Sequence, residues 1–131
     1  MVPIKVFIVD DSAHVVEVLS ELIEEAGRVT VCGSAASARD AIDAIALIRP
    51  DVVVADLQLR EGTGFEVLEA VRAAGGIDGS LRPLFVLFSN HVGPELHRHA
   101  LARGADHFLD KTSDHGRLLE LIGERGTRHV A

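Results

Sequence analysis

Short runs of apolar residues alternate along this chain with longer segments in which apolar residues recur every three or four positions. This alternation is repeated five times and is typical of strand–helix units in an α/β domain. The apolar runs predict strands at residues 4–9, 28–32, 52–55, 84–88 and 106–109. The periodic segments predict helices that begin near residues 12, 37, 64, 94 and 116. We expect the last helix to end near Gly123, with a polar tail from about residue 124, and residues 75–80 to form a flexible connection.

The composition of each strand indicates its place in the sheet. Strands buried on both faces are almost continuously apolar, as the first, third and fourth are, whereas the second and fifth contain polar residues that suit an edge. The strand order 2-1-3-4-5 meets this condition and allows right-handed crossovers. We therefore predict a three-layer α/β sandwich around one parallel sheet, with a ligand site where the first and third strands end.

Length and composition restrict the possible functions. A chain of 131 residues fits one domain, so we expect residues 1–131 to form a single unit. The net charge of -7 argues against a nucleic-acid surface, which needs a basic patch. Cys32 is the one cysteine, and the sequence has neither a signal-peptide pattern nor a membrane-spanning apolar run. We expect a cytoplasmic protein that does not contact a membrane.

Polar residues stand at the ends of four predicted strands. They are Asp10 and Asp11 after the first strand, Asp56 after the third, Ser89 after the fourth and Lys111 after the fifth. The carboxyl ends of parallel strands meet at one edge of a sheet, so these side chains can converge. Three carboxylates that repel one another call for a divalent cation, and oxygen ligands favour Mg2+. Asp56, at the tip of the central strand, is placed to act as a nucleophile that forms an aspartyl phosphate, while Asp10 and Asp11 hold the metal.

The lysine is informative because the chain has eleven arginines and only two lysines. A compact ammonium at residue 111 suits a phosphoryl oxygen and a carboxylate, and Ser89 offers a short hydroxyl donor. Taken singly, each of these residues has an ordinary explanation as a helix cap, a turn residue or a solvated charge. Their joint occurrence at neighbouring strand ends favours a phosphate site.

Two weaker signals receive ordinary interpretations. The Gly-Thr-Gly segment at residues 62–64 lacks the lysine of a phosphate-binding loop and is interpreted as a loop and helix start. No two of three neighbouring histidines have the spacing of metal ligands on a helix, so we interpret them as surface residues; they are His91, His97 and His99.

As a set, the strand-end residues and their surroundings resemble the receiver domain of two-component response regulators over nearly the whole chain. The matching segments are residues 9–12 (VDDS), 49–56 (RPDVVVAD), 87–90 (LFSN) and 104–111 (GADHFLDK). The resemblance implies a flavodoxin-like (βα)5 fold and phosphotransfer to Asp56 from a histidine kinase or a histidine phosphotransfer protein. It also implies that Mg2+ is bound by Asp10, Asp11, Asp56 and the backbone carbonyl of Gln58.

The resemblance further implies roles for residues around the phosphate site. Ser89 and Phe108 correspond to a hydroxyl–aromatic switch pair, and Gln58 and His91 tune the lifetime of the phosphate. One departure concerns the residue after the lysine, which is proline in many receivers, often with a cis bond, and Thr112 here. A cis bond without proline costs about 2.5 to 4 kcal/mol, so we expect a trans bond and a different loop.

We expect a stand-alone phosphorylatable switch rather than an enzyme, with its own phosphorylation and dephosphorylation as its only chemistry. The fourth helix, fifth strand and fifth helix should bind a downstream protein partner, and the first helix should dock the kinase. One alternative is the receiver of a longer regulator with an effector domain. A metal-dependent phosphohydrolase would need a second acid beside Asp56, which Leu57 and Gln58 do not provide. A flavin-binding protein is disfavoured by the acidic first loop and by the absence of Trp and Tyr.

Overall fold

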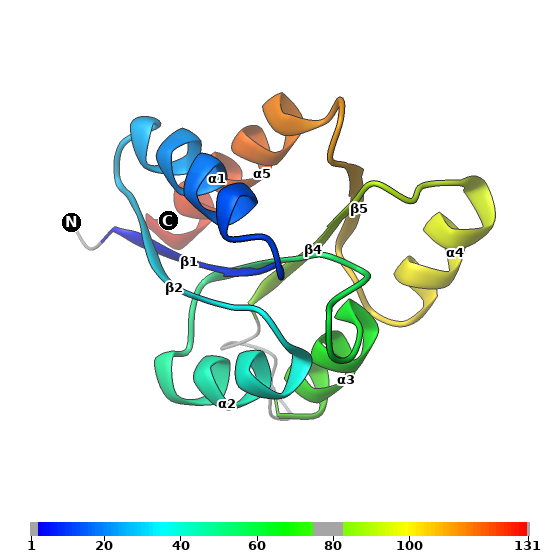
Figure 1. Ribbon diagram of the computed structural model, residues 1–131. Helices are drawn as coiled ribbons and strands as arrows, with labels where there is room; N and C mark the ends of the chain where they lie inside the picture. The colour runs from blue at the N-terminus through cyan, green and yellow to red at the C-terminus, as the bar shows by residue number, and fades with distance from the viewer. Residues whose placement is uncertain (1–2, 75–82, 131) are drawn as a thin grey trace.

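The computed structural model describes residues 3–74 and 83–130, with side chains described up to residue 125 (Figure 1). Five parallel strands form one sheet of order β2-β1-β3-β4-β5, which confirms the predicted order. The strands are β1 (Ile4–Val9), β2 (Val29–Ala35), β3 (Val52–Ala55), β4 (Leu84–Ser89) and β5 (His107–Asp110). The helices are α1 (Ala13–Glu25), α2 (Ala38–Ile48), α3 (Gly64–Ala74), α4 (Pro94–Ala102) and α5 (His115–Val130).

The sheet is the middle of three layers because successive strand side chains point to opposite faces. In β1, Phe7 and Val9 belong to the apolar cluster that contains α2, α3 and α4, whereas Val6 and Ile8 belong to the cluster that contains α1 and α5. Figure 1 shows α1 and α5 on one side of the sheet and α2 and α3 on the other. The three central strands are covered on both faces, which explains their continuous apolar sequences.

Local signals set the ends of the first two helices. The hydroxyls of Ser12 and Ser37 accept hydrogen bonds from backbone N–H groups three residues later, which caps α1 and α2. After α1 the chain turns at Gly27, whose φ of 77° suits a residue without a side chain. After α2 it turns at Arg49, which adopts the left-handed conformation before Pro50.

Strand β2 is longer than predicted. Gly33 and Ser34 have the composition of a loop, but in the structure they pair with β1. The pairing shifts between Val6 and Phe7, so that Val31 and Gly33 are the successive partners. A Cβ added to Gly33 would lie 3.1 Å from the Phe7 ring, so the glycine lets β2 pass close to this ring. Tertiary pairing therefore overrides the local composition.

Helix α5 is also longer than predicted, and the polar tail expected from about residue 124 is helical to Val130. The apolar face that defined the prediction ends at Ile122. On the exposed face of this helix, Arg117 forms ion pairs with Glu120 at 3.1 Å and, beyond Ile122, with Glu124 at 3.7 Å, which support the helix where apolar periodicity has ended.

Smaller differences concern the last two strands. Ser89 is the final residue of β4 rather than the residue after it, and β5 is displaced by one residue from the predicted 106–109. The predicted flexible connection at 75–80 lies outside the described residues. Within residues 3–74 and 83–130, no helix has the length and apolar character needed to cross a membrane.

Candidate functional site

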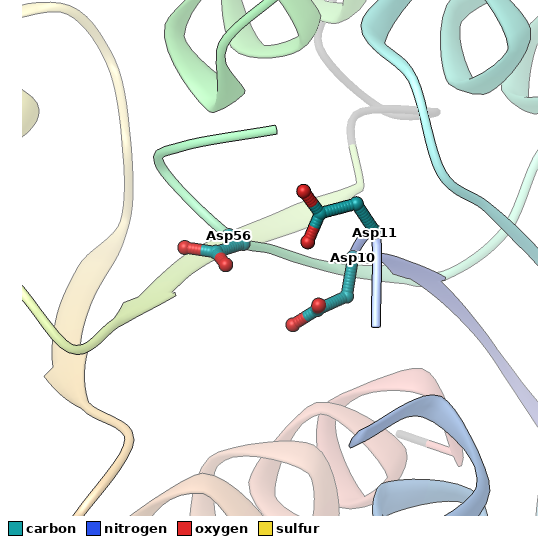
Figure 2. Close-up of side chains that lie close together, drawn as sticks. All are labelled: Asp10, Asp11 and Asp56. Atoms are coloured by element: carbon teal, nitrogen blue, oxygen red, sulfur yellow. The ribbon is translucent and has the colours of Figure 1, made fainter. Parts of the chain in front are cut away.

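Three carboxylates meet where β1 and β3 end. These strands are neighbours, with Val9 paired to Ala55, and the backbone N–H of Asp56 donates to the Val9 carbonyl at 2.8 Å. One carboxylate oxygen from each of Asp10, Asp11 and Asp56 lies within 4.8 Å of the other two. Figure 2 shows the three side chains gathered at the two strand ends. The predicted convergence of these residues is therefore present in the structure.

Lys111 follows β5, the outermost strand on one side of the sheet, and contacts two of these carboxylates. Its Nζ donates to Asp10 Oδ2 at 2.5 Å and to Asp56 Oδ2 at 2.8 Å. The Lys111 and Asp10 side chains are 10% and 3% exposed, and that of Asp56 is 14% exposed. Burial alone would lower the pKa of Lys111, but the hydrogen bonds and charges of Asp10 and Asp56 outweigh it and raise that pKa above its ordinary value. The ammonium therefore stays charged at neutral pH.

Ser89 joins the site at the end of β4, where it is fully buried. Its carbonyl accepts a hydrogen bond from the Lys111 backbone N–H at 2.9 Å, and its Oγ accepts one from the His91 backbone N–H at 3.1 Å. The five strand-end residues thus lie together at the carboxyl ends of the strands. Their chemical roles remain predictions.

The loop after Asp56 closes tightly onto the start of α3. Gln58 is exposed, and its N–H lies 3.4 Å from Asp56 Oδ1. The Gly64 N–H donates to the Leu57 carbonyl at 2.9 Å, which draws the loop into a compact turn. The prediction of a loop and helix start at residues 62–64 is confirmed. Its importance was missed: a Cβ on Gly64 would collide with the Asp56 carbonyl oxygen and lie 2.9 Å from the Leu87 side chain.

Phe108 is 6% exposed and packs in the cluster that contains α2, α3 and α4. The His97 ring lies 6.0 Å from it, measured between centroids. Beside these rings lies a pocket of about 400 Å3, lined also by residues of the β4–α4 and β5–α5 loops. The three histidines predicted at the surface are exposed, although His97 contacts Phe108 and His99 contacts Phe65 edge-on at 5.2 Å.

The β5–α5 loop differs from the form with a cis proline. The described part of the chain contains no cis peptide bond, which agrees with the trans bond expected after Lys111. Asp110 Oδ1 instead accepts hydrogen bonds from the Thr112 N–H at 2.8 Å and the Thr112 hydroxyl at 2.6 Å. These bonds, the hydroxyl first, lower the pKa of Asp110.

The donor set fits a hard divalent cation. Asp10, Asp11 and Asp56 provide oxygen ligands close enough to share one ion, without a cysteine or histidine among them. Such a set suits Mg2+, which accepts a few carboxylates and keeps places for water and phosphate oxygens.

Comparison with known proteins places this geometry in a family. A model of the response regulator receiver domain matches residues 6–123. A protein-glutamate methylesterase/protein-glutamine glutaminase of Symbiobacterium thermophilum is 36% identical over 114 residues, which make up 85% of this chain and 30% of that enzyme. The chain thus spans about 30% of the length of this curated relative.

Solved structures agree with this assignment. A two-component response regulator of the LuxR family from Aurantimonas sp. SI85-9A1 is 30% identical with a TM-score of 0.83, covering 93% of this chain and 84% of that one. The chemotaxis response regulator CheY4 of Vibrio cholerae is 27% identical with a TM-score of 0.79, covering 94% and 98% of the two chains. This chain therefore belongs to the response regulator receiver domain family.

Proposed function

We propose that this receiver domain accepts a phosphoryl group on Asp56 and acts as a signalling switch. The contact of one partly buried ammonium with both Asp10 and Asp56 supports the proposal most directly. It supplies a fixed positive charge beside a carboxylate at the tip of a central strand, where an incoming phosphoryl oxygen needs one. The donor would be a histidine kinase or a histidine phosphotransfer protein. An Asp56 carboxylate oxygen attacks the phosphorus, a P–O bond forms, and the P–N bond to the donor histidine breaks.

We propose Mg2+ as the cofactor, held by Asp10, Asp11, Asp56 and the backbone carbonyl of Gln58. The three clustered carboxylates support this assignment. When bound, Mg2+ supplies positive charge that offsets the carboxylates and the anionic phosphoryl group. Lys111 then remains available to pair with a phosphoryl oxygen, and Ser89 donates its hydroxyl to another.

Labelling with a small phosphodonor tests the acceptor. Intact mass and peptide mapping should show one phosphoryl group, on Asp56, and the reaction should require Mg2+. Asp56→Asn should remove the label, because the amide is not a nucleophile of this kind. A label that persists in Asp56→Asn, or in excess chelator, would contradict the proposal. Continuous release of phosphate from a phosphate ester would favour a phosphohydrolase instead.

The proposed role of Lys111 can be tested separately from metal binding. Lys111→Ala should retain Mg2+ affinity and lose the phosphorylation-dependent change, because the ammonium pairs with the phosphoryl group. Lys5→Ala is the matched control, since the other lysine bonds to the Ile48 carbonyl at the end of α2. Equal loss of metal binding and response in Lys111→Ala would show that the lysine organises the carboxylates themselves.

Gln58 and His91, each two residues beyond a site residue, are proposed to tune the lifetime of the phosphate. Both are exposed, and their backbone N–H groups point to Asp56 Oδ1 and Ser89 Oγ. Substitutions of either side chain should change the dephosphorylation rate. Unchanged lifetimes across several side chains at both positions would remove them from the mechanism.

We propose that the output is the binding of a protein partner, rather than of nucleic acid or a membrane, to the surface formed by α4, β5 and α5, with Ser89 and Phe108 as the switch pair. The chain corresponds to about 30% of the methylesterase, so that enzyme's activity is not assigned to it. We also propose that the protein is cytoplasmic, because it must meet the phosphorylated histidine of its kinase.

A further inference from the structure

Two carboxylates, those of Asp110 and Asp114, organise the loop that carries Lys111. Asp110 Oδ1 accepts from both the amide and the hydroxyl of Thr112, at 2.8 and 2.6 Å. The Asp110 N–H donates to Asp114 Oδ2 at 2.8 Å, and the Asp110 carbonyl accepts from the Asp114 N–H at 2.9 Å. The bond from the Thr112 N–H is of the kind that aspartate makes with its own following backbone, and the two bonds between Asp110 and Asp114 close the turn.

This turn brackets Lys111 on both sides. On one side, Asp110 is tied to Asp114, whose carbonyl accepts from the Leu118 N–H at 3.0 Å in the first turn of α5. On the other side, Thr112 is tied to the Asp110 carboxylate. The Lys111 backbone itself donates to the Ser89 carbonyl. The residues on both sides of the lysine, and its own N–H, are therefore fixed.

The position of the lysine backbone matters because its side chain is long and has several rotatable bonds. Nζ reaches Asp10 and Asp56 together only if the Cα stays at a suitable distance from both strand ends. In a loop without proline, the backbone restraint must come from hydrogen bonds. The hydrogen bonds from Thr112 lower the pKa of Asp110, whose ionised carboxylate is a strong acceptor.

We infer that Asp110, acting through the hydrogen bonds of its carboxylate with Thr112, is a positioning residue that holds Lys111 where its ammonium can engage a phosphoryl group on Asp56. This inference rests on the proposed function of Asp56 and Lys111. Asp110 itself does not touch the reacting atoms. Its carboxylate substitutes for the rigidity that a proline after the lysine would provide.

Two affinities measured on the full chain test the inference. Mg2+ affinity and beryllofluoride affinity in saturating Mg2+ are compared for Asp110→Ala and Asp110→Asn. Asp110→Ala should weaken beryllofluoride binding about tenfold or more and leave Mg2+ affinity within about twofold, because misplaced supporting groups cost this much at reactive sites. Asp110→Asn keeps an Oδ1 acceptor and should recover most of the loss.

Variants of neighbouring residues show which bonds matter. Thr112→Val removes one hydrogen bond from the turn and should produce part of the loss seen in Asp110→Ala. Ser113→Ala is the matched control, because residue 113 contributes its backbone N–H to the Asp110 carbonyl and keeps it in the variant. If Asp110→Ala does not fold, Thr112→Val, whose altered side chain is exposed, decides the question.

A double-mutant cycle separates positioning from general stability. If Asp110 acts through the lysine, Asp110→Ala should cause no further loss of beryllofluoride affinity in a Lys111→Ala background. Additive losses, or wild-type behaviour of Asp110→Ala and Thr112→Val beside a defective Lys111→Ala, would overturn this inference alone. A wild-type chain that neither labels on Asp56 nor binds beryllofluoride would overturn the proposed function and this inference with it.

Discussion

At Gly64 the absence of a side chain decides how closely the loop after β3 approaches α3. The φ of Gly64 is not among the left-handed values of the described glycines, so an alanine could adopt the same backbone. The obstacle is space, because the new Cβ would collide with the Asp56 carbonyl oxygen. This glycine therefore fixes the main chain that follows the proposed acceptor.

We predict that Gly64→Ala lowers the free energy of unfolding by about 1 to 3 kcal/mol, as overpacking does, and slows labelling of Asp56. Chemical denaturation and phosphodonor labelling measure the two effects. Gly116→Ala, where an added Cβ meets nothing within 4 Å, is the control and should not destabilise the protein. Wild-type stability and labelling in Gly64→Ala would show that the loop after Asp56 can move to accommodate the methyl group without loss of stability.

The pKa of Cys32 is affected by its position in the edge strand β2. It is half-buried in β2, and its Sγ lies 3.3 Å from the Val6 carbonyl. Burial raises the pKa of the thiol above its ordinary value of 9.0, so the reactive thiolate is scarcer in the folded protein than in the unfolded chain.

Between pH 9.0 and the higher pKa of the folded protein, the unfolded chain binds fewer protons at Cys32. The stability contributed by this thiol is therefore complete below pH 9.0 and decreases as the pH rises above it. The difference in unfolding free energy between wild type and Cys32→Ala should be constant around neutral pH and should shrink as the pH rises above 9.0. A difference that grows with pH would contradict the raised pKa.

Among the elements, α3 is joined to the amino ends of β4 and β5 by one arginine. Arg72 donates to the Pro83 carbonyl at 3.0 Å, to the Gly104 carbonyl at 2.9 Å and to Asp106 Oδ2 at 2.8 Å. The same Asp106 oxygen accepts from the Phe85 N–H at 2.8 Å. These groups lie at the amino ends of the strands, whereas Asp56 lies at the carboxyl end of β3.

Arg72→Ala should lower the free energy of unfolding by about 2 to 3 kcal/mol, because it leaves a partly buried carboxylate and two carbonyls without this donor. Labelling of Asp56 should persist under native conditions. The comparison is Arg103→Ala, whose ion pair with Glu69 is exposed and should contribute less than about 1 kcal/mol. Loss of labelling in folded Arg72→Ala would mean that the two ends of the strands are coupled.

The elements also show what sequence alone can predict. Apolar runs located the central strands because burial on both faces leaves a strong signal, and strand-end positions located Asp10, Asp56 and Lys111. The added length of β2 depends on Gly33 passing the Phe7 ring, a contact between distant residues that local composition does not encode. The closed turn of Asp110 was likewise missed, since its partners become apparent only when the loop is folded.

At the scale of the whole molecule, the proposed site and the proposed output surface share β4 and β5. Ser89 lies at the end of β4, and its neighbour in the next strand, Asp110, is two residues from Phe108. Phe108 is already buried in this structure, against the cluster of α2, α3 and α4. We expect a change at Asp56 to reach this ring by a discrete repacking of the β4–α4 loop.

We predict that beryllofluoride shifts the amide signals of residues 91–103 and of Phe108, while α1 changes little. NMR shifts or amide exchange with and without the mimic measure this, and Asp56→Asn is the control that should show no response. Changes confined to the loop after Asp56 would contradict the switch, even if Asp56 is the acceptor.

The strand order has a consequence for how the protein is made. Strands β1, β2 and β3 form one contiguous half of the sheet from residues 4–55, after which β4 adds to β3 and β5 adds to β4 in the order of synthesis. The chain is synthesised from its amino terminus, whereas a domain generally folds as a unit. The acidic groups of the site are therefore synthesised early, while the lysine that binds two of them is synthesised last. A growing chain that stops before β5 would carry all three carboxylates and lack the lysine that contacts two of them in the folded domain.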